Sequence, residues 1–325
     1  MSAPAPPVAP NPPATPRPSS TAGRGGTSGS WGAVIRHELV SSRRERTVHT
    51  LLVVFLAMVS ASSLIGWLTN QTVTRVWQQT TDAGLTHAPN PFTGAPPLAY
   101  AKNVVIYVIL IGALLAIVLG ATSLLRSRTS HTVDLLLSRP VDVRVYLAAK
   151  VTGLAVLLAT ILAAAAAVTW VSIAVILHHP LGVGPTLRLA GFYTVAGILL
   201  MGFVVMGMIS GLYARTQTSA VLSPIVVWSV IVFIVPQLGT AALPVSLLNP
   251  VPSIVTTGGV FSVVHTLLGP LSVTEQFKTI SGALLGTSPT GGAIPALATV
   301  IAFLTLGLAV LLRTRRDVLR RDLRD

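Results

Sequence analysis

The sequence predicts an all-α integral membrane protein with six transmembrane helices, and three observations support this prediction. Hydrophobic residues make up 52% of the 325 residues and charged residues only 10%, whereas soluble domains carry about a quarter charged residues. The apolar residues form six runs that approach or exceed the ~20 residues needed to cross the hydrocarbon core. The formal net charge of +13 lies beside those runs, which favours membrane topology over nucleic-acid binding as its explanation.

The N-terminal region divides into two parts. Residues 1–30 are rich in Pro, Ala, Ser and Gly, so we expect a disordered tail, and we expect no signal peptide because no apolar segment follows Met1. In residues 31–47, apolar side chains share one helical face and arginines lie on the other. This pattern predicts an amphipathic interfacial helix along the cytoplasmic leaflet. The alternative is that 31–47 is only a charged flank of the first span.

Residues 48–313 form the predicted six-span transmembrane domain. The fifth apolar run is the shortest and contains Pro224, which predicts a kink. Small-residue faces, above all Gly207-x-x-x-Gly211, predict close helix approach, either within one subunit or at a dimer seam. We expect the six spans near 51–69, 104–125, 151–177, 187–213, 220–236 and 293–312.

The orientation follows from the distribution of basic residues. With both termini inside, 18 of the 22 Lys and Arg residues are cytoplasmic and four face outward: Arg75, Lys102, Arg188 and Lys278. We therefore expect a multi-pass protein of the plasma membrane with both termini in the cytoplasm. Residues 314–325 are then a short charged cytoplasmic tail.

Two of the segments between spans are long and are expected on the outer side. Residues 70–103 include HAPNPFTGAPP and are expected to form a turn-rich loop. Residues 237–292 contain the apolar stretch 251–271, which glycines and prolines interrupt. A seventh span would move the basic C-terminus outside, so we expect a re-entrant or surface helical pair before the last span. Its irregular backbone must be shielded by protein or water.

Residues 126–150 connect the second and third spans and hold five of the 22 Lys and Arg residues. Val133 and the pair Leu136–Leu137 recur at helical spacing, and Pro140 must follow the end of the helix. The pattern therefore predicts a short amphipathic helix over 130–139. Its apolar strip faces the cytoplasm and requires a partner, which we expect to be another protein.

This segment resembles the type-2 ABC transporter permeases, and more narrowly the branch that contains the nitrous oxide reductase maturation permease. The motif there reads roughly Gly-Thr-Leu-Glu-Leu-Leu-Leu-Ser-x-Pro-Val-x-x-Arg, with a lysine shortly after. This chain departs at His131, where the family usually has glycine, and at Arg128, where a glutamate is missing. The matching positions are Thr132, Asp134, Leu135, Leu136, Leu137, Ser138, Pro140, Arg144 and Lys150.

The resemblance implies that this segment is a coupling helix that rests in a groove of an ATPase subunit. The alternative is an ordinary basic loop that obeys the topology rules. The residues that the resemblance implies as ATPase contacts are Thr132, Asp134, Leu136, Leu137, Ser138, Arg139, Pro140 and Arg144.

The sequence contains no recognisable catalytic apparatus. It has no cysteine, no Gly-x-x-x-x-Gly-Lys-Ser/Thr phosphate loop, and no Gly-x-Ser-x-Gly or His-Glu-x-x-His motif. The predicted spans lack the internal charges that ion-coupled carriers use. The pair His178-His179 is a weak metal candidate, because adjacent residues on a helix point apart and no carboxylate is near in sequence. His265 and Glu275, in the long segment before the last span, are equally weak metal candidates. We expect no enzyme activity, cofactor or metal in this chain.

Together these observations indicate the permease subunit of an ABC exporter. ATP would be bound by a separate ABC ATPase, and two permease subunits, identical or paralogous, would join two ATPases in the lipid bilayer. No nucleic acid is expected as a partner. Two alternatives stay open: a secondary transporter or channel, and a membrane-anchored scaffold or assembly protein.

We predict that residues 126–150 are cytoplasmic and that 237–292 face outward. Since the chain has no cysteine, a single introduced cysteine reports on one position. In intact cells, a membrane-impermeant maleimide is expected to label His265→Cys strongly and His131→Cys not at all. The reverse labelling pattern contradicts this topology.

Overall fold

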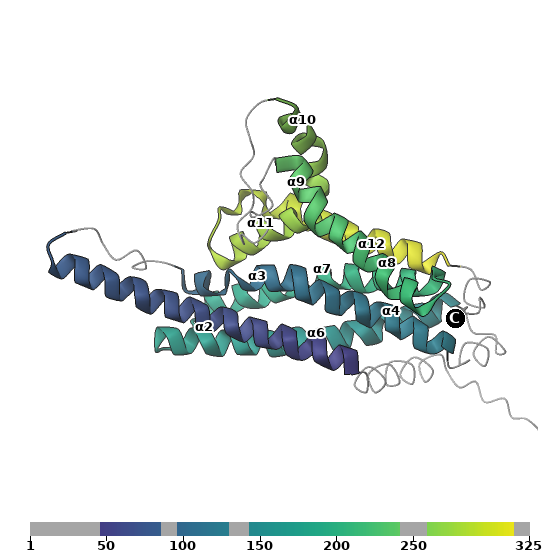
Figure 1. Ribbon diagram of the computed structural model, residues 1–325, viewed down its shortest axis with the longest axis horizontal. Helices are drawn as coiled ribbons and strands as arrows, with labels where there is room; N and C mark the ends of the chain where they lie inside the picture. The colour runs from purple at the N-terminus through teal and green to yellow at the C-terminus, as the bar shows by residue number, and fades with distance from the viewer. Residues whose placement is uncertain (1–45, 86–95, 130–142, 241–258, 315–325) are drawn as a thin grey trace, which may run out of the picture.

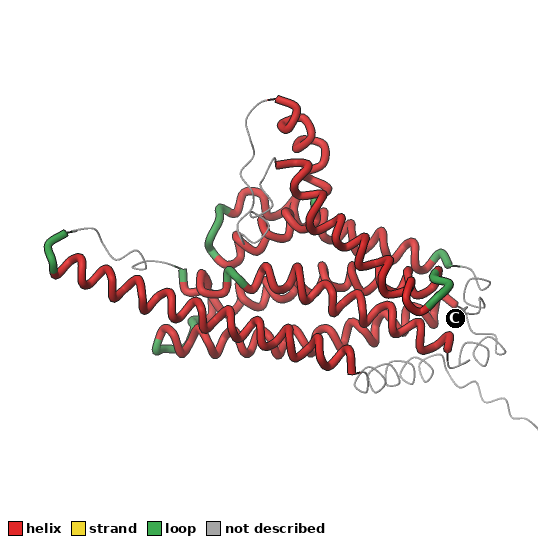
Figure 2. Tube along the Cα trace, in the orientation of Figure 1, coloured by secondary structure: helices red, strands yellow, loops and turns green. Residues whose placement is uncertain are grey.

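The computed structural model describes residues 46–85, 96–129, 143–240 and 259–314, and the regular structure in these ranges is helical throughout (Figure 2). Two of the η elements, η2 and η3, are π-helical turns, and the others are 3₁₀ turns. In chain order the elements are α2 (Arg46–Asp82), η1 (Pro97–Ala101), α3 (Val104–Tyr107), η2 (Val108–Gly112), α4 (Ala113–Thr129), α6 (Val143–Leu177), α7 (Val183–Tyr213), α8 (Gln217–Ser229), η3 (Val230–Ile234), α9 (Val235–Thr240), α10 (Gly259–Leu268), η5 (Gly269–Leu271), α11 (Val273–Leu285), η6 (Thr290–Gly292) and α12 (Ala293–Leu312).

Six helical segments of the described chain are long and apolar enough to cross a membrane, which confirms the predicted number of spans. The fifth runs through Pro224 without leaving α geometry there, and a π-helical turn follows at η3. The kink at Pro224 stays a prediction. The six segments are His49–Asp82, Pro97–Arg128, Val143–Leu177, Val183–Tyr213, Gln217–Gln237 and Thr290–Leu312.

The first span is longer than predicted. Residues 70–82 continue α2, so the turn-rich loop expected over 70–103 was wrong for this stretch. The reason is that residues 70–83 are mostly polar but contain no glycine or proline to interrupt the helix. Gly84 then ends it in the left-handed conformation, with φ +69°, as glycine commonly does at a helix C-terminus.

The two central helices are α4 and α7. In the most apolar stretch of their spans 72% of the residues are buried, against 17–39% in the other four spans. α2 and α6 lie on one side of this central pair, and α8 and α12 lie on the other (Figure 1). The outer helices expose large apolar side chains, as surfaces that meet lipid or another membrane subunit do; examples are Val53, Leu64, Val175, Leu222 and Leu306.

The central helices touch through their backbones. A Cβ atom added at Gly120 of α4 would collide with the carbonyl oxygen of Val204, and one at Gly207 of α7 would collide with that of Ile117. Small residues permit this close approach of membrane helices. The face that contains Gly207 and Gly211 is therefore covered by α4, which supports packing within one subunit over a dimer seam at this face.

The chain before the last span contains two helices in its described part, as predicted. α10 has ten residues, too few for a seventh span, and it projects away from the bundle (Figure 1). α11 lies against α7 and α12 and buries Phe277 and Ile280. The predicted tail 1–30, the interfacial helix apart from its last two residues, and the tail after Thr314 lie outside the described residues.

We predict that Gly207→Ala separates α4 from α7. The added methyl group collides with the backbone of Ile117, which cannot move aside as a side chain does, and overpacking of this kind costs about 1–3 kcal/mol. Fluorescence-detected gel filtration after heating should show a midpoint several degrees lower. The matched control is Gly184→Ala on the same helix, where nothing lies within 4 Å of an added Cβ. An equal effect of the two substitutions contradicts the prediction.

Candidate functional site

The connection between α4 and α6 is the candidate site. Seven of the eight predicted contact residues, Thr132 to Pro140, lie outside the described residues. The eighth, Arg144, is exposed in the first turn of α6. The structure describes how the two ends of this connection, residues 123–129 and 143–150, join the rest of the bundle.

Arg128, in the last turn of α4, holds the C-terminal end of α7. One guanidinium nitrogen donates to the carbonyl oxygens of Gly211 at 2.8 Å and Ala214 at 3.0 Å, and the residue is only 9% exposed. The last carbonyl groups of a helix lack partners within the helix and carry its partial negative charge. Arg128 therefore supplies these carbonyls with a charged donor and fixes the ends of the two central helices to each other.

Two residues of α6 join it to α4. The Lys150 ammonium, 3% exposed, donates to the carbonyl oxygen of Ser123 at 2.8 Å and to its Oγ at 2.9 Å. The Tyr146 hydroxyl donates to Ser127 Oγ at 3.0 Å. Residues four apart share one face of a helix, so these side chains form two adjacent contacts across the interface. The ammonium also lies 5.8 Å from the centre of the Tyr146 ring, within the range of a cation–π interaction.

We call these five side chains the joint: Ser123, Ser127, Arg128, Tyr146 and Lys150. The joint connects α4, α6 and α7 at the end of the bundle where the chain leaves α4 and returns in α6. It is buried, and its cations are held by carbonyl and hydroxyl oxygens of neighbouring helices. Because buried charges are costly unless they are hydrogen-bonded, these contacts hold the three helix ends in one arrangement.

The structure changes the interpretation of two residues. Lys150 matched the coupling motif, but α6 begins at Val143 rather than near 151, so Lys150 lies inside the helix and faces the bundle interior. Arg128 was noted only as a departure from the family motif. A basic residue in the last turn of a helix favours contact with helix carbonyls, and this was the available signal. Its acceptors, Gly211 and Ala214, are 83 and 86 residues away, so the sequence did not identify them.

The pair His178-His179, a metal candidate in the sequence, lies just after α6. His178 ends α6 with φ 58°, and His179 Nδ1 lies 3.1 Å from the carbonyl oxygen of Pro180. Within the described ranges, no three His, Cys, Asp or Glu side chains are grouped so that they could hold a metal ion. Glu275 is buried and pairs with Lys278 on the same helix.

We predict that Arg128→Met loosens the end of α7. The carbonyl groups of Gly211 and Ala214 lose a charged donor, so local opening should become about tenfold or more frequent. Hydrogen–deuterium exchange of the amides in the last turn of α7 is expected to accelerate by the same factor. Arg313→Met, an exposed arginine just after α12, is the control and should leave these amides unchanged. Unchanged exchange in Arg128→Met contradicts the capping role.

Comparison with known proteins places this arrangement in a family. The family model described as "ABC-2 family transporter protein" matches residues 32–316, which include all six spans and the joint. No curated protein matches the chain. Because the family match covers most of the sequence, the protein belongs to the ABC-2 transporter family and is a multi-pass membrane permease subunit of an ABC transporter.

Proposed function

We propose that this permease works as an exporter and is driven by a separate ATPase that docks on the coupling helix expected over residues 130–139. The observation that carries the proposal is the joint. The segment that resembles the family's coupling helix follows α4 and precedes α6. Buried polar contacts join α4 to α7 and α6 to α4. The resemblance to the branch of the nitrous oxide reductase maturation permease is narrower than the family match, and it rests on the motif in residues 132–150 alone.

The joint provides a route from the docking segment to the spans. ATP binding would close the ATPase subunits and displace the coupling helix expected over residues 130–139. Arg128 would pass this displacement from α4 to the end of α7, while Lys150 and Tyr146 couple α6 to α4. Backbone contact at Gly120 and Gly207 continues the connection along α4 and α7. We infer that α4, α6 and α7 move as one rigid body between inward- and outward-facing states.

The docking contact itself is proposed to be apolar. Leu136 and Leu137 would be covered by the ATPase groove, and each fully buried leucine contributes about 1.5–3 kcal/mol. Arg144 lies exposed in the first turn of α6 beside this segment, and Arg139 belongs to the segment itself. Charges at the rim of an interface chiefly tune the association rate, so we assign these arginines a steering role.

We further propose that two permease subunits, identical or paralogous, pair in the plasma membrane with both termini in the cytoplasm. The three outer spans that contain α2, α8 and α12 bury only 17–22% of their most apolar stretch within the subunit. Their exposed apolar surface suits contact with both lipid and a second permease. The positive-inside bias of 18 to four Lys and Arg residues supports the orientation.

One observation bears on the alternative of a secondary transporter. Glu275 and Lys278 form a buried ion pair, and ion-coupled carriers place ionisable groups in their pathway. This pair lies on α11, outside the six candidate spans. Its two charges compensate each other at 2.9 Å, and its position outside the spans does not favour an ion-coupled pathway through them.

We predict that Leu136→Asp combined with Leu137→Asp leaves the spans inserted, releases the ATPase and abolishes stimulated ATP hydrolysis. The double variant loses the stabilisation that two buried leucines provide, and burial of the two new carboxylates adds a cost of desolvation. The measurements are co-purification of the ATPase with the tagged permease and ATP hydrolysis by the reconstituted complex.

The control is Leu85→Asp, a 78% exposed leucine just after α2 at the opposite end of the bundle. It should retain the ATPase and its stimulation. Poor insertion of the double variant would instead indicate that the two leucines pack on the membrane surface. A stably inserted double variant that keeps its ATPase at wild-type stoichiometry and coupling contradicts the proposal.

A further inference from the structure

The fifth span leaves the bundle after the π-helical turn η3. α8, which precedes the turn, lies against α4 and α7. α9, which follows it, packs chiefly on α10 and projects with it away from the other helices (Figure 1). We call α9 and α10 together the arm. α10 exposes Val260, Val263 and Leu267 by 77%, 61% and 67%, so the arm is much less enclosed than the helix from which it continues.

Pro236, the second residue of α9, gives η3 a cause in the sequence. Proline has no backbone N–H, and within an α-helix its ring collides with the carbonyl group four residues earlier, here that of Val232. The N–H of Val235 donates instead to the carbonyl oxygen of Val230, five residues earlier, as in a π-helix. Such π-helical adjustments accommodate prolines in membrane helices, and sharp bends of helices concentrate at these two features.

Trp228 holds the helix to the bundle just before η3. Its Nε1–H donates to the carbonyl oxygen of Ile109 at 3.2 Å, and the residue is only 7% exposed. Its ring meets the Phe233 ring edge-on, with the two centroids 5.5 Å apart. Ile109 belongs to η2 of the second span, which continues into the central helix α4. The side of η3 that faces α8 is therefore fixed to the core.

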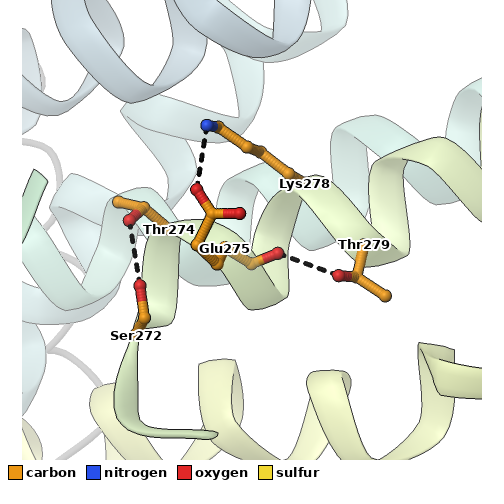
Figure 3. A network of polar contacts seen from close by, with 5 residues as sticks. All are labelled: Ser272, Thr274, Glu275, Lys278 and Thr279. Carbon is orange, nitrogen blue, oxygen red and sulfur yellow. Dashed lines mark hydrogen bonds and ion pairs between the residues drawn. The ribbon is translucent and has the colours of Figure 1, made fainter. Parts of the chain in front are cut away.

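The other end of the arm is fixed as well. α10 runs into η5, where the Thr299 hydroxyl of α12 donates to the carbonyl oxygen of Pro270 at 3.0 Å. α11 follows and lies against α7 and α12. Its ion pair, Lys278 with Glu275 at 2.9 Å, lies within the helix and does not reach the arm (Figure 3). The arm is thus attached to the bundle at both of its ends.

The packing beside η3 is incomplete. A cavity of about 20 Å³, which has room for about one water molecule, lies between η2, η3 and α11. Val232 and Phe233 of η3 line this cavity together with Lys278 of α11. Protein interiors contain few voids of this size, so the side chains of η3 have unusual freedom to change their positions.

We propose that η3 and Pro236 form a hinge about which the arm swings relative to the bundle. α10 has ten residues and is therefore about 15 Å long. A change of about 20° at the base, the size of an ordinary helix kink, displaces Val260 at the tip by about 5 Å. The arm belongs to the segment predicted to lie on the outer side, so its motion changes the shape of the outer end of the permease. This inference does not depend on the proposed ATPase contact.

The test is double electron–electron resonance on the purified permease in nanodiscs, without ATPase. Since the chain has no cysteine, labels at Leu222→Cys on α8 and Val260→Cys on α10 report the distance across the hinge. The reference pair is Leu222→Cys with Leu306→Cys on α12, two exposed positions within the bundle. An excess of unlabelled chain removes distances between copies. We expect the distance distribution across the hinge to be about 5 Å wider than that of the reference pair.

Pro236→Ala restores a backbone N–H and removes the ring, so η3 should revert to α-helical geometry and the hinge should stiffen. The distribution across the hinge is expected to narrow to the width of the reference pair. The matched control is Pro295→Ala in the first turn of α12, where a missing N–H costs no helical hydrogen bond, and it should change neither width. Equal widths of the two pairs without a proline substitution, or an excess width that survives Pro236→Ala, overturns the proposal.

Discussion

The backbone contact between α4 and α7 is the constraint on which the rest of the structure depends. Hydrophobic burial cannot drive two helices together within lipid, so close packing and hydrogen bonds must do so. Gly120 and Gly207 remove the side chains that would keep these helices apart. The resulting central pair offers one side to α2 and α6 and the other to α8 and α12. Each outer span thereby packs on a rigid centre and keeps an apolar face exposed.

The two ends of this centre carry different chemistry. At one end, Arg128 and Lys150 are buried against carbonyl and hydroxyl oxygens of neighbouring helices. These contacts hold three helix ends together where the chain leaves α4 and where it enters α6. At the other end, Lys278 is paired within its own helix and lies beside two π-helical turns. The first arrangement joins three helices, whereas the ion pair of the second lies within one helix.

Much of the fold followed from local properties of the sequence. A run of about 20 apolar residues is sufficient to place a membrane helix, so all six spans were predicted. Glycines and prolines within 251–271 argued against a seventh span, and α10 and α11 are short helices. The prediction failed over 70–82, because hydropathy detects the apolar part of a helix and not a polar continuation that contains no helix breaker.

What the sequence by itself determined is therefore the number, type and approximate limits of the helices, and the motif that suggested the family. The tertiary structure decided which surfaces are covered. Gly207 and Gly211 could have faced a second subunit, and only the position of α4 shows that they do not. Lys150 and Arg128 find partners 27 and 83 residues away. Such contacts depend on how helices cross in space, and no local pattern of residues encodes that arrangement.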